Sequence, residues 1–261
     1  MRSSDHVHTN WDEVEAENIR LLQNKTIAES VGEYLVLQHE FAAHLEETEP
    51  LFRSQRDEAM LQLQARLVQL HTKYPHNMEN LFVAITDLQK TLEDADIPSA
   101  LIGGLAVGVW GEPRLTRDVD LKVLAWREER ARVLQVLSHL TPLNADPDGA
   151  FQRNGIAFFQ TPGGVRVDVM LTDTHFDETV IGRAKMVDLQ PGWSARVCSA
   201  EDLIIYKLVS IRPRDRLDVE GNVKRQGQKL DDAYVENWLR QFEQALDDST
   251  LVAEYRRFRG K

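Results

Sequence analysis

The stretch ALIGGLAVGVWGEPRLTRDVDLKVL, residues 100–124, decides the fold of this chain. It places two adjacent glycines, Gly103 and Gly104, at the end of a short apolar run. Farther along, Asp118 and Asp120 are separated by one valine inside what otherwise has the pattern of a buried strand. Because side chains alternate along a strand, the two carboxylates are expected to lie on one face, where they repel each other. The pattern therefore predicts that a neighbouring group compensates the repulsion between these two carboxylates.

A divalent cation is the simplest solution to this repulsion. Mg²⁺ prefers a few carboxylates together with phosphate oxygens and water. A third carboxylate of the same character is Asp168, which lies in VRVDVML on a segment predicted to be a neighbouring strand. We predict that Asp118, Asp120 and Asp168 converge into a site able to hold two metal ions. In such a site one ion activates an attacking hydroxyl and the other stabilises the leaving oxygen.

The two glycines predict an anion site beside the metal. A Gly-Gly turn that leads into a helix lets backbone N–H groups approach a phosphate, and the helix N-terminus favours negative charge. Gly103 and Gly104 are therefore candidate phosphate-binding residues. Either motif alone is weak, and it is their combination with a third aspartate on a strand that indicates a function.

The predicted elements around these motifs give an α+β (or α/β) fold with a small mixed β-sheet flanked by helices. Strands are expected in SALIGG, DVDLKVL, IAFFQ, VRVDVML and ARVCS. Helices are expected in GLAVGVWG, REERARVLQVLSHL, HFDETVIGRAK and SAEDLIIYKLVSI, and a loop in TPLNADPDG. TPGG predicts a hairpin between the third and fourth strands.

The regions on either side of this sheet have helical patterning. Three or four amphipathic helices are expected between residues 10 and 92, because apolar residues recur there three and four positions apart. The predicted organisation is an N-terminal helical region, 1–77, a core, 78–198, and a helical C-terminal region, 199–261.

Composition limits the function classes. The chain has 261 residues, 42% apolar and 28% charged, which is typical of a soluble globular protein. Its apolar runs are too short to span a membrane, no secretory signal is recognisable, and the single cysteine, Cys198, is expected to be buried, so we expect a cytoplasmic protein. The net charge of −11 argues against a protein that coats nucleic acid, while the basic cluster at 211–225 suits a phosphate-handling site.

LIGGLAVGVWGEPRLTRDVDLKV resembles the signature of the DNA polymerase β-like nucleotidyltransferase superfamily, in which Gly-Gly or Gly-Ser precedes Asp-apolar-Asp. Its RLTRDVD form, with Arg114 and Thr116, is similar to the branch that contains the AbiEii-type abortive-infection toxins. That branch tends to carry a later block of Lys, Arg and Asp-x-x-Asp. EDLIIYKLVSIRPRDRLD supplies these residues as Lys207, Arg212, Asp215 and Asp218.

The resemblance implies a nucleotidyltransferase fold and a role for each matching residue. Gly103 and Gly104 would hold a triphosphate, and Asp118 and Asp120 would bind Mg²⁺. Asp168 would complete the metal site and help to deprotonate the acceptor hydroxyl.

For the remaining matching residues the sequence leaves two readings open. Lys207 would reach the phosphates, or else lie along an amphipathic helix with its charge in solvent. Asp215 and Asp218 would orient basic or acceptor groups, or form surface salt bridges. Arg114, with Thr116 beside the nucleotide, would pair with phosphates or with the metal-site aspartates.

Two function classes follow. The first is an enzyme that transfers a nucleoside monophosphate from an NTP such as ATP or GTP to an acceptor hydroxyl on a tRNA end, a protein or a small molecule. It would be the toxin of a toxin–antitoxin or phage-defence system, with a cognate antitoxin or self-association through the N-terminal helices. The alternative is a binding or regulatory module of the same fold, whose N-terminal helices dock or inhibit a partner.

Overall fold

A seven-stranded mixed β-sheet organises the computed structural model, which describes residues 20, 24–26, 28–30, 32, 76–114, 116, 118–210 and 212–260. The strand order is β3-β4-β5-β2-β1-β7-β6. The strands are β1 (Ser99–Leu101), β2 (Asp118–Val123), β3 (Thr141–Pro142), β4 (Ile156–Gln160), β5 (Arg166–Leu171), β6 (Lys185–Gln190) and β7 (Trp193–Val197).

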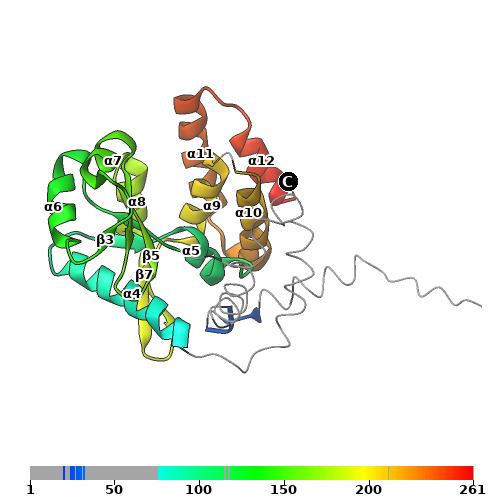
Figure 1. The fold of residues 1–261 in the computed structure, drawn as a ribbon. Coiled ribbons are helices and arrows are strands. Elements are labelled where there is room, and N and C mark those ends of the chain that lie inside the picture. Colours follow the sequence, from blue (N-terminus) through cyan, green and yellow to red (C-terminus); the bar gives the residue numbers. More distant parts are fainter. Residues whose placement is uncertain are drawn as a thin grey trace, which may run out of the picture.

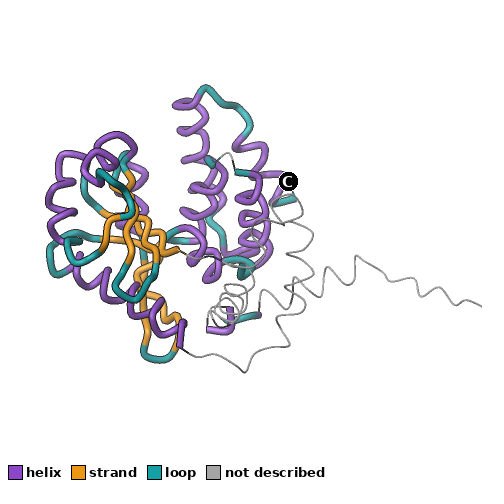
Figure 2. Tube along the Cα trace, viewed as in Figure 1, coloured by secondary structure: helices purple, strands orange, loops and turns teal. Residues whose placement is uncertain are grey.

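The helices fall into two groups, which Figure 1 shows beside the sheet and to its right. Those that follow or cover the sheet are α4 (His76–Glu93), α5 (Gly103–Trp110), α6 (Arg130–Val136), α7 (Pro147–Asn154) and α8 (His175–Arg183). Those of the C-terminal group are α9 (Ala200–Val209), α10 (Pro213–Gln226), α11 (Asp232–Leu246) and α12 (Leu251–Phe258). Strands are confined to one side of the molecule, as Figure 2 makes plain, and α5 connects the two sides by packing on β2, α9 and α10.

Strand β2 sits in the middle of the sheet because one of its faces is wholly apolar. Val119, Leu121 and Val123 are completely buried, whereas Asp118, Asp120 and Lys122 alternate with them. β2 pairs in parallel with β5 and antiparallel with β1. The central position of β2 therefore gives the carboxylates a rigid support.

The α+β fold class and the five predicted strands are confirmed, and the buried position of Cys198 is too. The sheet is larger than expected, because Lys185–Gln190 forms β6, whose buried residues Val187 and Leu189 alternate with exposed ones. The prediction of a loop throughout 141–149 was wrong. Asp146 accepts a hydrogen bond from the Gly149 backbone N–H and Pro147 follows it, so turn-forming residues here begin helix α7.

The expected helix over 127–140 is interrupted. A single 3₁₀ turn, Arg127–Glu129, precedes α6, which ends at Val136. The last predicted N-terminal helix is present as α4, and the earlier ones lie outside the described residues. No helix in the described part of the chain is both long and apolar enough to cross a membrane.

Arg225 joins a short N-terminal segment to the core. The side chain is buried on α10, and its guanidinium donates to backbone carbonyls of Gly108 and Gly111, at the end of α5. It also donates to the carbonyls of Lys25 and Thr26, 3.0 and 3.3 Å away. We call these contacts the Arg225 clasp. The clasp holds together three parts of the chain that are far apart in sequence.

Replacing Arg225 by methionine should lower the free energy of unfolding by about 3 kcal/mol, because the buried carbonyls lose their donor. Chemical denaturation of the full chain measures this change. Arg240→Met is the matched control, since Arg240 is half exposed and pairs with Glu236 one helical turn away, an interaction worth about 0.5 kcal/mol. Equal stability of the two variants would contradict the structural role of the clasp.

Candidate active site

The three predicted aspartates come from two adjacent strands in register. Asp120 on β2 lies directly opposite Asp168 on β5, and Asp118 lies opposite Arg166. Parallel neighbours in register present their side chains on the same face of a sheet. The structure thus brings the three carboxylates onto one face.

Burial and mutual repulsion shift the pKa values of two of these carboxylates, Asp120 and Asp168. Burial, followed by the charge of Asp118, raises the pKa of Asp120 to about 7. Burial also raises the pKa of Asp168, against the opposing effect of the Arg166 guanidinium. Two neighbouring carboxylates with raised pKa values, Asp120 and Asp168, are typical of a functional site, because folding holds the charges there at a cost.

The raised pKa of Asp120 predicts how stability changes with pH. A carboxyl whose folded pKa lies above its unfolded value binds a proton more tightly in the folded state, so its contribution to stability grows as the pH falls from above 7 toward 4. We expect the free energy of unfolding in chelator to decrease between pH 5 and pH 8, and Asp120→Asn to flatten that slope. Denaturation curves at several pH values measure it, and an unchanged slope in the variant would rule out Asp120 as its source.

The Gly-Gly turn lies against the carboxylates. Gly103 begins α5 with a φ of +63°, a conformation that favours glycine. The Gly104 backbone N–H donates to Asp120 over 3.2 Å, and Thr116 donates its hydroxyl to Asp118 over 2.6 Å. Residue 102 supplies no side-chain cap to α5. The first turn of α5 thus directs backbone donors toward the face that carries the aspartates.

Gly103→Ala should reduce any transfer activity by about a hundredfold or more, since a Cβ there would overlap the carboxylate of Asp120. The matched control is Gly164→Ala. Gly164 also has a positive φ, +82°, but a Cβ there meets nothing within 4 Å. The control therefore carries the backbone strain without the clash, and equal losses in the two variants would show that strain alone explains the effect.

Lys207 lies in a buried network of charges rather than along the helix surface. Its ammonium is 2.6 Å from Asp215 and 2.9 Å from Asp218. Arg114 completes the network with two hydrogen bonds to Asp218, of 2.5 and 2.8 Å. All four side chains are largely buried, so Asp215 and Asp218 are not surface salt bridges.

This network lies close to the carboxylates. Burial raises the pKa of Asp218, but Arg114 and then Lys207 outweigh this effect and hold it below its usual range. The charges of Lys207 and Arg114 also act on Asp120. Two cations, already oriented by two buried aspartates, therefore lie close enough to Asp120 to act on its charge.

Arg166 is a residue of this site that the sequence reasoning missed. Its guanidinium makes two hydrogen bonds to Asp168, of 2.7 and 3.1 Å, and lies over the ring of Phe158 at 4.7 Å. Phe158 itself is directly opposite Asp168 on β4. The sequence VRVDVML could have indicated this contact, because Arg166 and Asp168 are two residues apart and therefore share a strand face.

The donor chemistry of the site suits Mg²⁺, which prefers a few carboxylates together with phosphate oxygens and water. No group of three or more His, Cys, Asp or Glu residues within the described ranges is arranged to hold a metal ion as it stands. Asp118, Asp120 and Asp168 are instead hydrogen-bonded to Thr116, Gly104 and Arg166 respectively.

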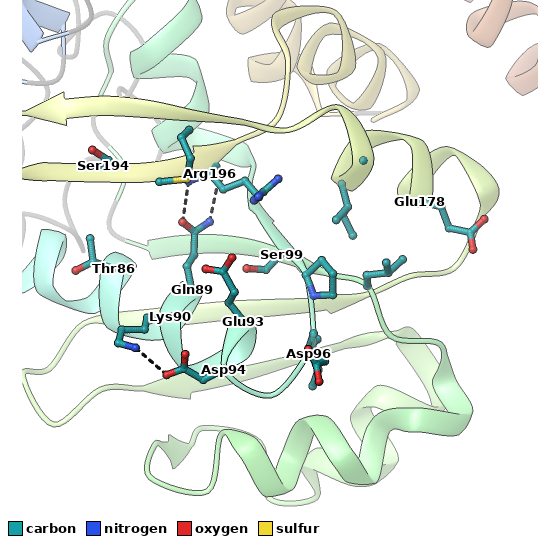
Figure 3. A pocket seen from close by; sticks show the side chains of 16 residues that line it. Thr86, Gln89, Lys90, Glu93, Asp94, Asp96, Ser99, Glu178, Ser194 and Arg196 are labelled. Carbon is teal, nitrogen blue, oxygen red and sulfur yellow. Dashed lines mark hydrogen bonds and ion pairs between the residues drawn. The ribbon is translucent and has the colours of Figure 1, made fainter.

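A separate hollow of about 710 Å³ lies away from these residues, between α4, α8 and the strands β1 and β7. Figure 3 shows Gln89 pointing toward β7, where its amide exchanges two 2.8 Å hydrogen bonds with the Arg196 backbone. The hollow is lined by both acidic and basic side chains, and none of the candidate catalytic residues reaches it.

A family model described as nucleotidyl transferase AbiEii toxin, type IV toxin–antitoxin system, matches residues 88–224. That match contains every candidate catalytic and nucleotide-binding residue named above. No curated protein matches the sequence.

Several solved structures resemble the chain at low sequence identity. An antigenic nucleotidyltransferase-like protein from Paracoccidioides brasiliensis is 18% identical, with a TM-score of 0.40 over 67% of this chain and 93% of its own. The antibiotic-resistance factor ANT(2'')-Ia is 13% identical, with a TM-score of 0.45 over 65% and 96%. The lincosamide antibiotic adenylyltransferase LnuA is 14% identical, with a TM-score of 0.38 over 54% and 94%.

Proposed function

The chain belongs to the AbiEii family of nucleotidyl transferase toxins, and from this premise we propose that it transfers a nucleoside monophosphate from an NTP to an acceptor hydroxyl, with Mg²⁺ and release of pyrophosphate. The single observation that carries the proposal is the register of β2 and β5, which sets Asp120 opposite Asp168 beside the Gly-Gly turn. In the reaction the acceptor oxygen forms a bond to the α-phosphorus, and the bond to the pyrophosphate oxygen breaks.

The carboxylates supply the metal site in this proposal. Asp118, Asp120 and Asp168 would hold the ions, and Asp168 would help to accept the proton of the acceptor hydroxyl. Bound Mg²⁺ supplies charge stabilisation for the attacking and leaving oxygens. The raised pKa of Asp120 supports this arrangement, because a dication would compensate the charge that burial disfavours.

The phosphates would lie along the first turn of α5. Backbone N–H groups at Gly103 and Gly104 would donate to them, as at other helix N-termini that bind anions. Lys207 and Arg114 would contribute positive charge on the side of the phosphates that faces away from this turn of α5. Asp215 and Asp218 would orient these two cations, which agrees with their buried hydrogen bonds.

The acceptor would approach Asp168 from the side of β4, because α5 and its glycines lie on the other side of β2. On that side the half-buried ring of Phe158 lies beside Arg166. An aromatic ring next to a guanidinium suits a planar, anionic group. Of the three acceptor classes, an RNA end such as that of tRNA therefore fits this surface better than a protein or a cationic small molecule.

Incubation of the protein with each α-labelled NTP, Mg²⁺ and total cell extract tests the proposal. The RNA fraction should become labelled, and Asp118→Asn should prevent it. Label in the protein or small-molecule fraction would assign a different acceptor to the same reaction. The absence of Asp118-dependent label in every fraction would refute nucleotidyl transfer.

The alternative, regulation through the N-terminal region, is favoured by one observation. The described segment around Ser30 is attached to the end of α5, the helix that begins at the glycines, and Ser30 is completely buried against Arg225. If this segment restrains α5, Ser30→Trp should displace it and change the transfer rate. The same rate in variant and wild type would remove this role. The division into regions 1–77, 78–198 and 199–261 remains a prediction.

A further inference from the structure

Arg166 occupies the oxygens that a metal would need. Its two hydrogen bonds, of 2.7 and 3.1 Å, engage both carboxylate oxygens of Asp168. A bidentate pair of this kind is among the stronger side-chain interactions, and its geometry is fixed by the planar guanidinium. Asp168 in this state has neither oxygen free of the guanidinium.

The charge of Arg166 acts on the whole group of carboxylates. Its hydrogen bond to Asp168 is the main cause of its raised pKa, and the charges of Asp118 and Asp120 add to it. Arg166 therefore does for these carboxylates part of what a dication would do. The sequence left open that Arg114 pairs with the metal-site aspartates, but Arg114 is bonded to Asp218.

We propose that Arg166 is a built-in counter-ion that holds Asp168 while no metal is bound, releases it to the metal, and so sets the affinity of the site for divalent cations. The inference rests on the proposed function, which makes Asp168 a metal ligand. A bidentate guanidinium and a dication compete for the negative charge and the lone pairs of the same two oxygens, so binding of one weakens binding of the other. The affinity measured for the metal is then reduced by the stability of the Arg166–Asp168 pair.

The surroundings of Arg166 allow this exchange. Its side chain is 47% exposed while that of Asp168 is 11% exposed, so the arginine can turn toward solvent without disturbing the packed strand. Phe158 provides a surface on which the guanidinium stacks and over which it can slide. Rotation of one side chain, with the backbone of β5 unchanged, is sufficient.

Titration of the full-length protein with Mn²⁺, with free Mn²⁺ followed by electron paramagnetic resonance, tests the inference. Arg166→Gln should bind Mn²⁺ about tenfold more tightly than wild type, because it removes a competing charge next to the ligand. Arg166→Lys keeps the charge but loses the bidentate geometry, so its affinity should fall between the two. Arg153→Gln is the matched control, since Arg153 pairs with Asp146 at 3.5 Å on the exposed surface; its affinity should equal that of wild type.

Thermal denaturation gives a second measure that does not depend on the titration. Arg166→Gln should melt at a lower temperature than wild type in chelator, and should gain more than wild type when Mn²⁺ is added. Arg166→Lys serves for both measurements if the glutamine variant does not fold. An affinity for Mn²⁺ that is unchanged or weaker in the Arg166 variants would overturn the inference.

The two proposals fail in different ways. If wild type binds Mn²⁺, Asp120→Asn abolishes the binding and the Arg166 variants bind as wild type does, only the counter-ion role is lost. If Asp120→Asn binds Mn²⁺ as wild type does, or if no form binds it, the proposed metal site is refuted. The proposed role of Arg166, which depends on that site, is then refuted too.

Discussion

Asp120→Asn is expected to lower nucleotidyl transfer by about a thousandfold or more while the protein remains folded. Asparagine has nearly the shape of aspartate and can still accept the hydrogen bond from the Gly104 backbone N–H. It lacks the charge that a metal ligand needs. Because it also removes the repulsion from Asp118, the variant should be at least as stable as wild type in chelator.

Transfer rates with labelled NTP and melting temperatures in chelator measure the two parts of this prediction. Asp94→Asn is the control, because Asp94 pairs with Lys90 on the exposed surface just after α4 and lines the separate hollow, not the carboxylate site. It should leave both quantities unchanged. Transfer at the wild-type rate by Asp120→Asn would mean that the β2 carboxylates are not part of the reacting site.

Lys207→Met is expected to have the largest effect on stability, lowering the free energy of unfolding by about 3–5 kcal/mol. The substitution leaves the buried Asp215 without the cation that lies 2.6 Å from it. Asp218 keeps its two hydrogen bonds from Arg114, so the loss should come mainly from Asp215. Chemical denaturation of single and double variants separates the contribution of Asp215 from that of Asp218.

Adding Asp215→Asn to Lys207→Met should restore about half of the lost stability, since the uncompensated charge is gone. It should not restore transfer, because the cation that would reach the phosphates is still missing. Recovery of both quantities together would show that Lys207 only supports the fold. A Lys207→Met protein as stable as wild type would contradict the buried network itself.

The central part of the fold could be predicted from the sequence because its signals are local. Strict alternation in DVDLKV sets Asp118 and Asp120 on one face, and glycines at the start of α5 are required by a positive φ and a close carboxylate. Ser199, at the start of the predicted helix SAEDLIIYKLVSI, caps α9 through a hydrogen bond from the Asp202 backbone N–H. Each of these features depends on residues close together in the sequence, the most distant being Gly103 and Asp120 within one stretch of 25 residues.

What could not be predicted depends on contacts between distant segments. Lys207 has the spacing of an ordinary amphipathic helix, and nothing near it in sequence shows that α10 covers it with Asp215 and Asp218. Strand β6 lacks an aromatic or β-branched run and is recognisable only through its pairing with β7. The Arg225 clasp likewise joins residues about two hundred positions apart, a separation that no local pattern encodes.

The Arg114–Asp218–Lys207 network also has a consequence for the order in which the chain is made. During synthesis the glycines and all three candidate catalytic aspartates leave the ribosome before α10 does. Until Asp218 follows, the buried network that orients Arg114 and Lys207 is not assembled, so a nascent chain carries the three carboxylates without the finished site that we propose for phosphates. An enzyme whose product harms its own cell would thereby stay inactive through most of its translation.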